Sequence, residues 1–236
     1  MSVMADWGYA GKTGPDYWGL MDRTYEACSL GTRQSPVDLS ASGVLSNKII
    51  RLEYGEASLR WIESNMGPYL VPTPGCRLWL NDEAYELVDI HLHAPSEHRI
   101  NDSEYPMEVH IVHQGEHDGR VILGIPVQEG QGPAVMNSFW DTLQMRAESI
   151  SDGDILGEDW IQKSLGLVPP VAPCYIYEGS LTTPPCTEDV LWVVLDQPIY
   201  APAAVLQAYT EKYAPTNRPL QPLNGREVFK GNVLRS

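Results

Sequence analysis

The sequence has no apolar run long enough to cross a lipid bilayer, although 43% of its 236 residues are hydrophobic. Because a membrane-spanning helix needs about 20 consecutive apolar residues, no transmembrane segment is expected, and the hydrophobic side chains should form one large core. Internal repeats, low-complexity segments and linker-like stretches are also missing. The simplest prediction is a single domain over residues 1–236.

Positive charge is scarce, because 16 Lys and Arg residues stand against 31 Asp and Glu residues and give a formal net charge of −15. Nucleic acids and anionic membrane surfaces would repel such a chain, so no nucleic-acid partner is expected. The scattered carboxylates most simply form a solvated surface. Calcium binding at a mineral surface is an alternative that is compatible with an enzymatic activity.

None of the four cysteines belongs to a Cys-x-x-Cys pair, which argues against a cysteine-based structural zinc or redox site. Disulfides are possible, and they would indicate an oxidising compartment. The first residues lack the basic region and apolar stretch of an export signal. Either the protein stays inside the cell or its signal has been removed.

Runs that alternate in polarity or are rich in β-branched and aromatic residues predict a mainly β fold. The predicted strands cover residues 49–54, 59–62, 77–80, 86–93, 107–113, 121–127, 175–177 and 190–195. Two segments, 133–148 and 202–213, begin with a proline suited to the first turn of a helix. We therefore expect an α+β protein in which a few surface helices cover a sheet.

Three histidines lie in two of these strands, His91 and His93 in one and His110 in the other. Alternate side chains of a strand share a face, so a paired neighbouring strand could bring all three imidazoles together. Three neutral imidazoles with one open position form a catalytic zinc site, and Glu108 could accept the other ring N–H of a ligand. A lone histidine in an apolar strand is more often a core residue, and cobalt or iron could replace zinc.

Several short motifs extend this pattern over nearly the whole chain. They are Trp7-Gly-Tyr9, Gly14-Pro15, Gln34-Ser-Pro-Val-Asp38, His91-Leu-His-Ala-Pro-Ser-Glu-His98, Glu108-Val-His110, Gly179-Ser-Leu-Thr-Thr-Pro-Pro-Cys186 and Asn217-Arg-Pro-Leu-Gln-Pro222. In this order and spacing they resemble the alpha-class carbonic anhydrases. The resemblance implies a large, twisted, mostly antiparallel central sheet of about ten strands, a conical cleft, and reversible hydration of carbon dioxide to bicarbonate and a proton.

By this resemblance, His91, His93 and His110 are the ligands of Zn²⁺, which makes hydroxide available from water at neutral pH. Thr182 would accept the proton of this hydroxide and donate its own to Glu97, which orients the nucleophile. An apolar pocket suits an uncharged substrate. The resemblance places around that pocket Val112, Ile122, Leu181, Thr183, Val190 and Trp192.

The resemblance also implies hydrogen-bond partners behind the ligands. Glu108 would support His110, while His98 would bond Glu108 and Tyr177 rather than the metal. His93 would donate to a backbone carbonyl near Asn217. Asp89 stands where the family usually has glutamine, and as an acceptor from His91 it would raise the pKa of zinc-bound water.

A second departure concerns the exit of the proton. Many family members carry a shuttle histidine in the cleft, but the matching position here is Gly67, and no histidine precedes His91. Proton release is therefore expected to be slow.

Cys28 and Cys186 match a pair that forms a disulfide in exported members of the family. This match favours a secreted, periplasmic or organelle-lumen protein, while the state of Cys76 and Cys174 is left open. Inhibition by sulfonamides and anions is expected, as is a monomer or homodimer. A non-catalytic binding module of the same superfamily is the main alternative. Such a module is expected to have lost at least one zinc histidine, but all three are present here. No His-Glu-x-x-His motif suggests a peptidase.

Overall fold

The computed structural model describes residues 6–40, 44–64, 67–149, 152–156 and 159–235. The strands are β1 (Asp38–Leu39), β2 (Ile50–Tyr54), β3 (Leu59–Ile62), β4 (Tyr69–Pro72), β5 (Cys76–Leu80), β6 (Glu83–His93), β7 (Arg99–Ile100), β8 (Met107–Gln114), β9 (Arg120–Glu129), β10 (Ile155–Leu156), β11 (Val171–Ser180), β12 (Glu188–Leu195), β13 (Ile199–Ala201) and β14 (Phe229–Arg235). The helices are α1 (Trp18–Met21), α2 (Ala27–Leu30), α3 (Ala134–Ser149), α4 (Asp159–Leu165) and α5 (Ala203–Tyr213).

A twelve-stranded sheet dominates the molecule, in the order β10-β3-β4-β6-β5-β2-β14-β11-β12-β9-β13, with β8 paired to both β6 and β9. Among the described residues, the pairings β12–β9, β13–β9 and β14–β2 are parallel and the others in this sheet are antiparallel. β1 and β7 form a separate parallel pair. The predicted mainly β fold with a mostly antiparallel central sheet is confirmed.

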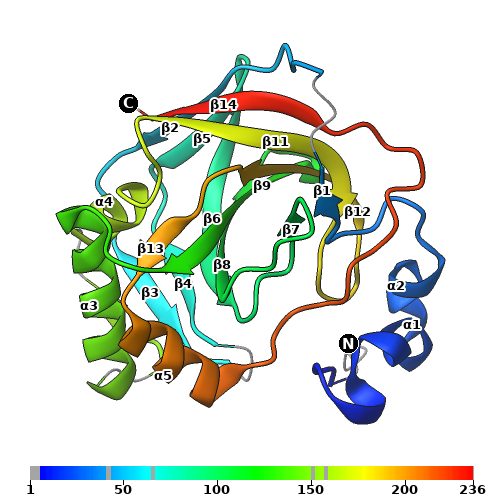
Figure 1. The fold of residues 1–236 in the computed structure, drawn as a ribbon, viewed down its shortest axis with the longest axis horizontal. Coiled ribbons are helices and arrows are strands. Elements are labelled where there is room, and N and C mark those ends of the chain that lie inside the picture. Colours follow the sequence, from blue (N-terminus) through cyan, green and yellow to red (C-terminus); the bar gives the residue numbers. More distant parts are fainter. Residues whose placement is uncertain (1–5, 41–43, 65–66, 150–151, 157–158, 236) are drawn as a thin grey trace.

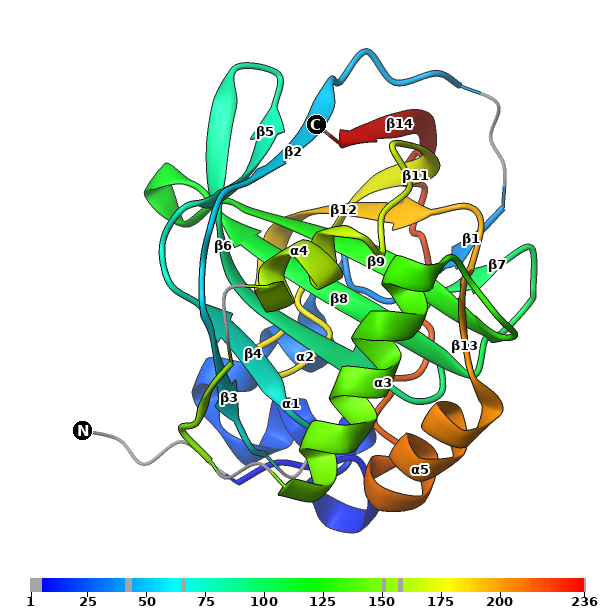
Figure 2. The same ribbon diagram turned by 90° about the vertical axis from the view of Figure 1, so that its left-hand side faces the viewer.

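The helices lie on opposite sides of the sheet. Helices α3, α4 and α5 cover one side, whereas the short helices α1 and α2 near the N-terminus lie on the other, as Figures 1 and 2 show from two directions. Both predicted helices are present, as α3, which is shifted by one residue at each end, and α5, which begins one residue later and ends where predicted. No helix of the described residues is long and apolar enough to span a membrane.

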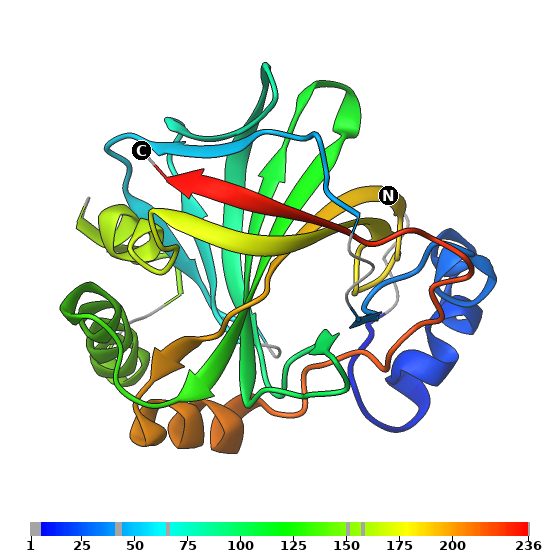
Figure 3. The same cartoon turned by 45° about the horizontal axis from the view of Figure 1, so that its top comes forward.

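The alternation of the central strands divides the core into two parts. On the side of α3, residues such as Val109 and Ile111 of β8 pack with Phe139 and Trp140 of the helix. On the opposite face, Val112 of β8 joins a second apolar cluster with residues of β9, β11 and β12. Because His110 and Val112 share this second face, the histidines project away from the main core. Strand β14, the last in the chain, crosses the sheet between β2 and β11 (Figure 3).

Candidate active site

Pairing of β6 with β8 brings the three histidines together. His91 lies directly opposite His110 in the register, and His93 follows two residues later on the same face. The ring centroids are 5.1 Å apart for His91 and His93, 5.2 Å for His91 and His110, and 4.6 Å for His93 and His110. One nitrogen from each ring lies within 4.8 Å of the others, which is a separation that a single metal ion could bridge.

A β-bulge in β6 adjusts which side chains reach this face. Leu87 is paired with His113, but Asp89 is paired with Val112, so Val88 is the extra residue of the bulge. Leu87 therefore packs into the main core, whereas Val88 and Asp89 both line the cavity on the other face. Without the bulge, Leu87 and Asp89 would lie on the same face of the strand and Val88 on the opposite face. The bulge therefore allows two adjacent residues of β6, Val88 and Asp89, to line the cavity.

Hydrogen bonds fix which nitrogen each imidazole leaves free. His91 donates from Nδ1 to Asp89 Oδ1 at 2.5 Å, and His110 donates from Nε2 to Glu108 Oε1 at 2.9 Å. His93 donates from Nδ1 to a backbone carbonyl at 2.5 Å. The free nitrogens are therefore Nε2 of His91, Nε2 of His93 and Nδ1 of His110. Nε2 of His93 is buried and has no hydrogen-bond partner, as expected for an atom that binds a metal.

The carbonyl that accepts from His93 belongs to Thr216, the residue before Asn217, and the resemblance implied a backbone carbonyl near Asn217. The Thr216 side chain accepts from the Ala94 amide at 3.0 Å, and its own amide donates to Ala94 O at 2.9 Å. These contacts hold the loop against the end of β6 and place the Thr216 carbonyl beside the ring.

Burial favours the neutral form of His93 and His110. It lowers the pKa of His110 to about 4 and holds the pKa of His93 well below its usual value. The side chain of His91 is more open, with 15% of its surface exposed. A neutral ring has a lone pair to offer, so the donor set fits a metal such as zinc.

Glu108 is the centre of the buried network behind His110. Its Oε1 also accepts from His98 Nδ1 at 2.8 Å, and the Tyr177 hydroxyl lies 2.6 Å from His98 Nε2. Burial alone would raise the pKa of Glu108, but His98 and His110 outweigh it and hold the pKa well below the usual value. On β9, Gly124 provides the space, because a Cβ there would lie 2.9 Å from Glu108 Oε1. The structure thus places His98 and Tyr177 where the resemblance implied.

Glu97 lies beside two of the free nitrogens, His93 Nε2 and His110 Nδ1, and Thr182 lines the cavity together with His91 and His110. Glu97 Oε1 accepts the Arg218 amide at 2.8 Å, while Oε2 lies 3.6 Å from His93 Nε2 without a hydrogen-bond partner. Burial raises the pKa of Glu97 to about 8, partly offset by a hydrogen bond from the Thr182 side chain. Thr182 itself is 5% exposed and lines the cavity.

A cavity of about 220 Å³ opens over His91 and His110. The predicted pocket residues that line it are Val112, Ile122, Leu181, Thr183 and Trp192. Val190 is buried in the same apolar cluster but lines an adjacent depression instead. Four further lining residues were missed by sequence reasoning: Tyr69, Val88, Gln114 and Arg120. Gln114 and Arg120 could have been predicted from strand alternation, because Gln114 is two residues after Val112 and Arg120 is two residues before Ile122.

Gly67 does not line this cavity. Its φ of +111° is one that other residues rarely adopt, and an added Cβ would lie 2.2 Å from the Tyr209 hydroxyl oxygen. The two preceding residues, 65 and 66, lie outside the described residues. The other histidines do not supply a group in the cavity either, because His113 is buried against Tyr54 and His117 is exposed in the β8–β9 turn.

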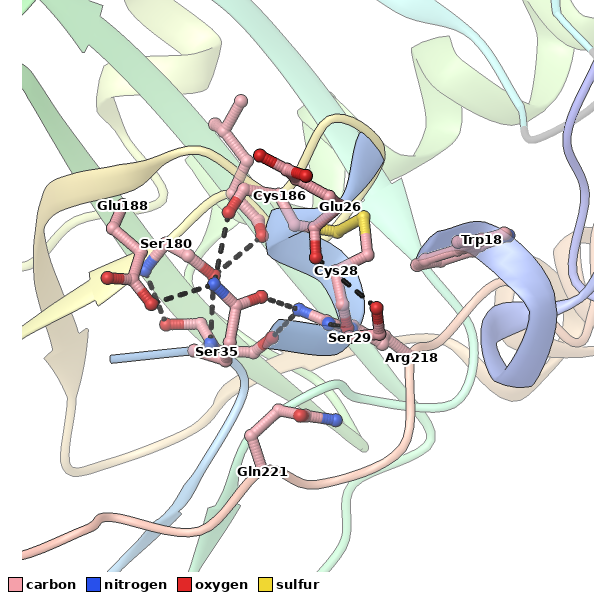
Figure 4. The surroundings of a disulfide bond; sticks show 12 residues. Trp18, Glu26, Cys28, Ser29, Ser35, Ser180, Cys186, Glu188, Arg218 and Gln221 are labelled. Carbon is pink, nitrogen blue, oxygen red and sulfur yellow. Dashed lines mark hydrogen bonds between the residues drawn. A yellow bond between two sulfur atoms is a disulfide. The ribbon is translucent and has the colours of Figure 1, made fainter. Parts of the chain in front are cut away.

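The disulfide joins Cys28 of α2 to Cys186 and is shown in Figure 4. The Cys186 amide donates to Thr183 O at 2.9 Å, so the bridge is attached to the loop that carries Thr182. Arg218 donates to the backbone carbonyl of Cys28 at 2.8 Å. Cys76 and Cys174, whose pairing was left open, are buried free thiols.

A family model described as eukaryotic-type carbonic anhydrase matches residues 13–232, so the chain belongs to this family. A carbonic anhydrase from Nostoc sp. is 31% identical over an alignment of 230 residues, and the alignment covers 95% of this chain and 86% of that protein. The solved α-carbonic anhydrase of Thermovibrio ammonificans with the inhibitor sulfanilamide has a TM-score of 0.82 at 28% identity, covering 95% of this chain and 99% of its own. The structure of dioscorin complexed with ascorbate has a TM-score of 0.81 at 26% identity. The match covers 98% of this chain and 100% of the dioscorin chain.

Proposed function

We propose that residues 1–236 form one domain that binds Zn²⁺ through His91, His93 and His110 and hydrates carbon dioxide reversibly. The observation that carries the proposal is the convergence of three free imidazole nitrogens, one of them buried without a partner. When bound, zinc would act as a Lewis acid that supplies hydroxide from water at neutral pH.

The other residues would position the reactants. The Thr182 hydroxyl donates to Glu97, so its oxygen is left to accept a proton from a group in the cavity, which selects ligands that have a proton to donate. Val112, Ile122 and Trp192 give the cavity a dry wall for an uncharged substrate. Asp89, Glu108 and the Thr216 carbonyl keep the three rings in one orientation.

The test is metal analysis of the purified protein together with a carbon dioxide hydration assay. One zinc per chain and activity that disappears with a chelator and returns with zinc are expected. A fully zinc-loaded chain without hydration activity would instead favour the binding module. Dioscorin, whose structure was solved with ascorbate, is an example of a structurally similar protein that binds a small molecule. All three histidines are retained in the present chain.

Imidazole buffer should raise the hydration turnover at least about threefold in dilute buffer near pH 7, because the cavity lacks a histidine that moves the proton to solution. Stopped-flow assays with increasing imidazole measure this effect. Pyrazole, a ring of the same size but a much weaker base, serves as the control. Adding a histidine at Gly67 would be a poor test, since that position faces Tyr209. A high turnover that does not respond to imidazole would refute the expectation.

Asp89→Gln should move the midpoint of the pH–activity profile down by about 0.5–1 unit. The acid form of the site carries one more positive charge than the base form, and the Asp89 carboxylate, which bonds His91, stabilises that acid form. Removing the negative charge therefore favours the base form at lower pH. Glu83→Gln, at the exposed start of the same strand, is the charge-matched control. An unchanged midpoint in Asp89→Gln would show that this carboxylate does not tune the site.

We further propose that the chain works in an oxidising compartment outside the cytoplasm and that sulfonamides inhibit it. The disulfide supports the first point. The sulfanilamide complex of the Thermovibrio relative supports the second.

A further inference from the structure

Arg120 places a positive charge at the cavity over the candidate metal site. It begins β9 and lies opposite Gln114 of β8 and Val190 of β12. Because it is two residues before Ile122, it shares the face that lines the cavity. Its side chain is partly buried, so it is held against the wall of the cavity rather than extended into bulk solvent.

This guanidinium has no ion pair or side-chain hydrogen bond within the part of the chain that the structure describes. Glu178 and Asp189 line the neighbouring depression together with Arg120, but both bind Arg33, at 3.3 Å and 2.5 Å. Asp89, the carboxylate of the cavity itself, bonds His91. Asp89, Glu178 and Asp189 therefore already have partners, and among the described residues no acceptor takes a hydrogen bond from the Arg120 guanidinium.

The three histidines and Arg120 are separated along the cavity. Arg120 is paired with Gln114, which is four residues from His110 on β8, or about 14 Å at roughly 3.4 Å per residue. Because the arginine side chain is long, its guanidinium can lie closer to the histidines than this backbone distance. A small molecule with a metal-binding group at one end and an anion at the other could span the distance between the guanidinium and the histidines.

We propose that Arg120 forms an anion subsite that takes the carboxylate of a ligand whose opposite end reaches the three histidines. The planar guanidinium matches a carboxylate with two parallel hydrogen bonds. In a chain with a formal charge of −15, an arginine that has no ion pair among the described residues also offsets the repulsion that an anionic ligand would otherwise meet. This inference rests on the proposed function, because it requires a metal-bound group at the base of the cavity.

Two benzenesulfonamides of equal size test the subsite, one with a para carboxylate and one with a para carboxamide. Their dissociation constants are measured on the zinc-loaded wild type, on Arg120→Gln and on Arg120→Lys. Arg120→Gln should weaken the carboxylate about fivefold, the size of one partly exposed ion pair, and the carboxamide less than twofold. Arg120→Lys, which keeps the charge, should retain much of the preference.

Arg51→Gln removes an exposed positive charge on β2, away from the cavity, and should change neither constant, because screening limits distant charges. If both compounds bind the wild type and Arg120→Gln changes them equally, the subsite is refuted while the proposed function stands. If Arg51→Gln reproduces the effect, net charge explains it and the subsite is also refuted. If neither compound binds the zinc-loaded wild type, both proposals are overturned.

Discussion

His93→Asn is expected to abolish carbon dioxide hydration and to weaken zinc binding by more than about 100-fold, since losing a group that only hydrogen-bonds a ligand already costs 10–100-fold. Among the described residues, the free nitrogen of His93, Nε2, is buried and has no hydrogen-bond partner. An amide nitrogen has no lone pair to replace it. Zinc affinity by competition with a chromogenic chelator and hydration by stopped flow measure the two effects.

His117→Asn is the matched control for this variant. His117 is exposed in the β8–β9 turn and has a φ of 61°, a conformation that asparagine tolerates. Zinc affinity and hydration should both stay at the wild-type level. Circular dichroism should show that each variant keeps its sheet. A folded His93→Asn protein that still holds one zinc and hydrates carbon dioxide would contradict the ligand assignment.

The Cys28→Ser/Cys186→Ser double variant is expected to lose about 2–5 kcal/mol of stability. The bridge closes a loop between residues 158 apart in the sequence, so its removal releases a large conformational entropy in the unfolded chain. For a protein of this size the melting temperature should fall by roughly 10 °C. Calorimetry or thermal denaturation followed by circular dichroism measures the change.

Reduction of the wild type gives an independent version of the same experiment. A reductant should lower the melting temperature of the wild type toward that of the double variant and leave the double variant itself unchanged. The two buried free thiols, Cys76 and Cys174, are present in both the wild type and the double variant, so they cannot account for a difference between the two proteins. If thiol titration shows full reduction of the wild type and its melting temperature does not move, the bridge does not contribute to stability.

Local patterns were sufficient to predict the metal-binding strands. Period-two alternation placed His91 and His93 on one face, and the β-rich run around His110 indicated a partner strand. The prolines at 133 and 202 correctly marked the starts of α3 and α5. Most of the predicted pocket residues, which followed from the family motifs, line the cavity, but Val190 lines the adjacent depression.

Features that depend on distant contacts could not be predicted in the same way. Gly231 and Asn232 interrupt the pattern of β14, yet this strand pairs centrally with β2 and β11 because Gly231 makes room for the Ile176 side chain. The bulge at Val88 reveals itself only in the register with β8. Likewise, the contact of Thr216 with His93 joins residues 123 apart. The charge of Arg120 can be read from the sequence, but only the folded structure shows that no described residue forms an ion pair with it.

Titration of the zinc-loaded protein with a tight-binding sulfonamide tests the central claim most directly, because it counts catalytic metal sites. The account predicts that the rate of carbon dioxide hydration falls linearly and reaches the background rate at one inhibitor per zinc. A protein that carries one zinc per chain but has no hydration activity to titrate, or one whose activity persists after the metal is saturated with sulfonamide, would contradict it.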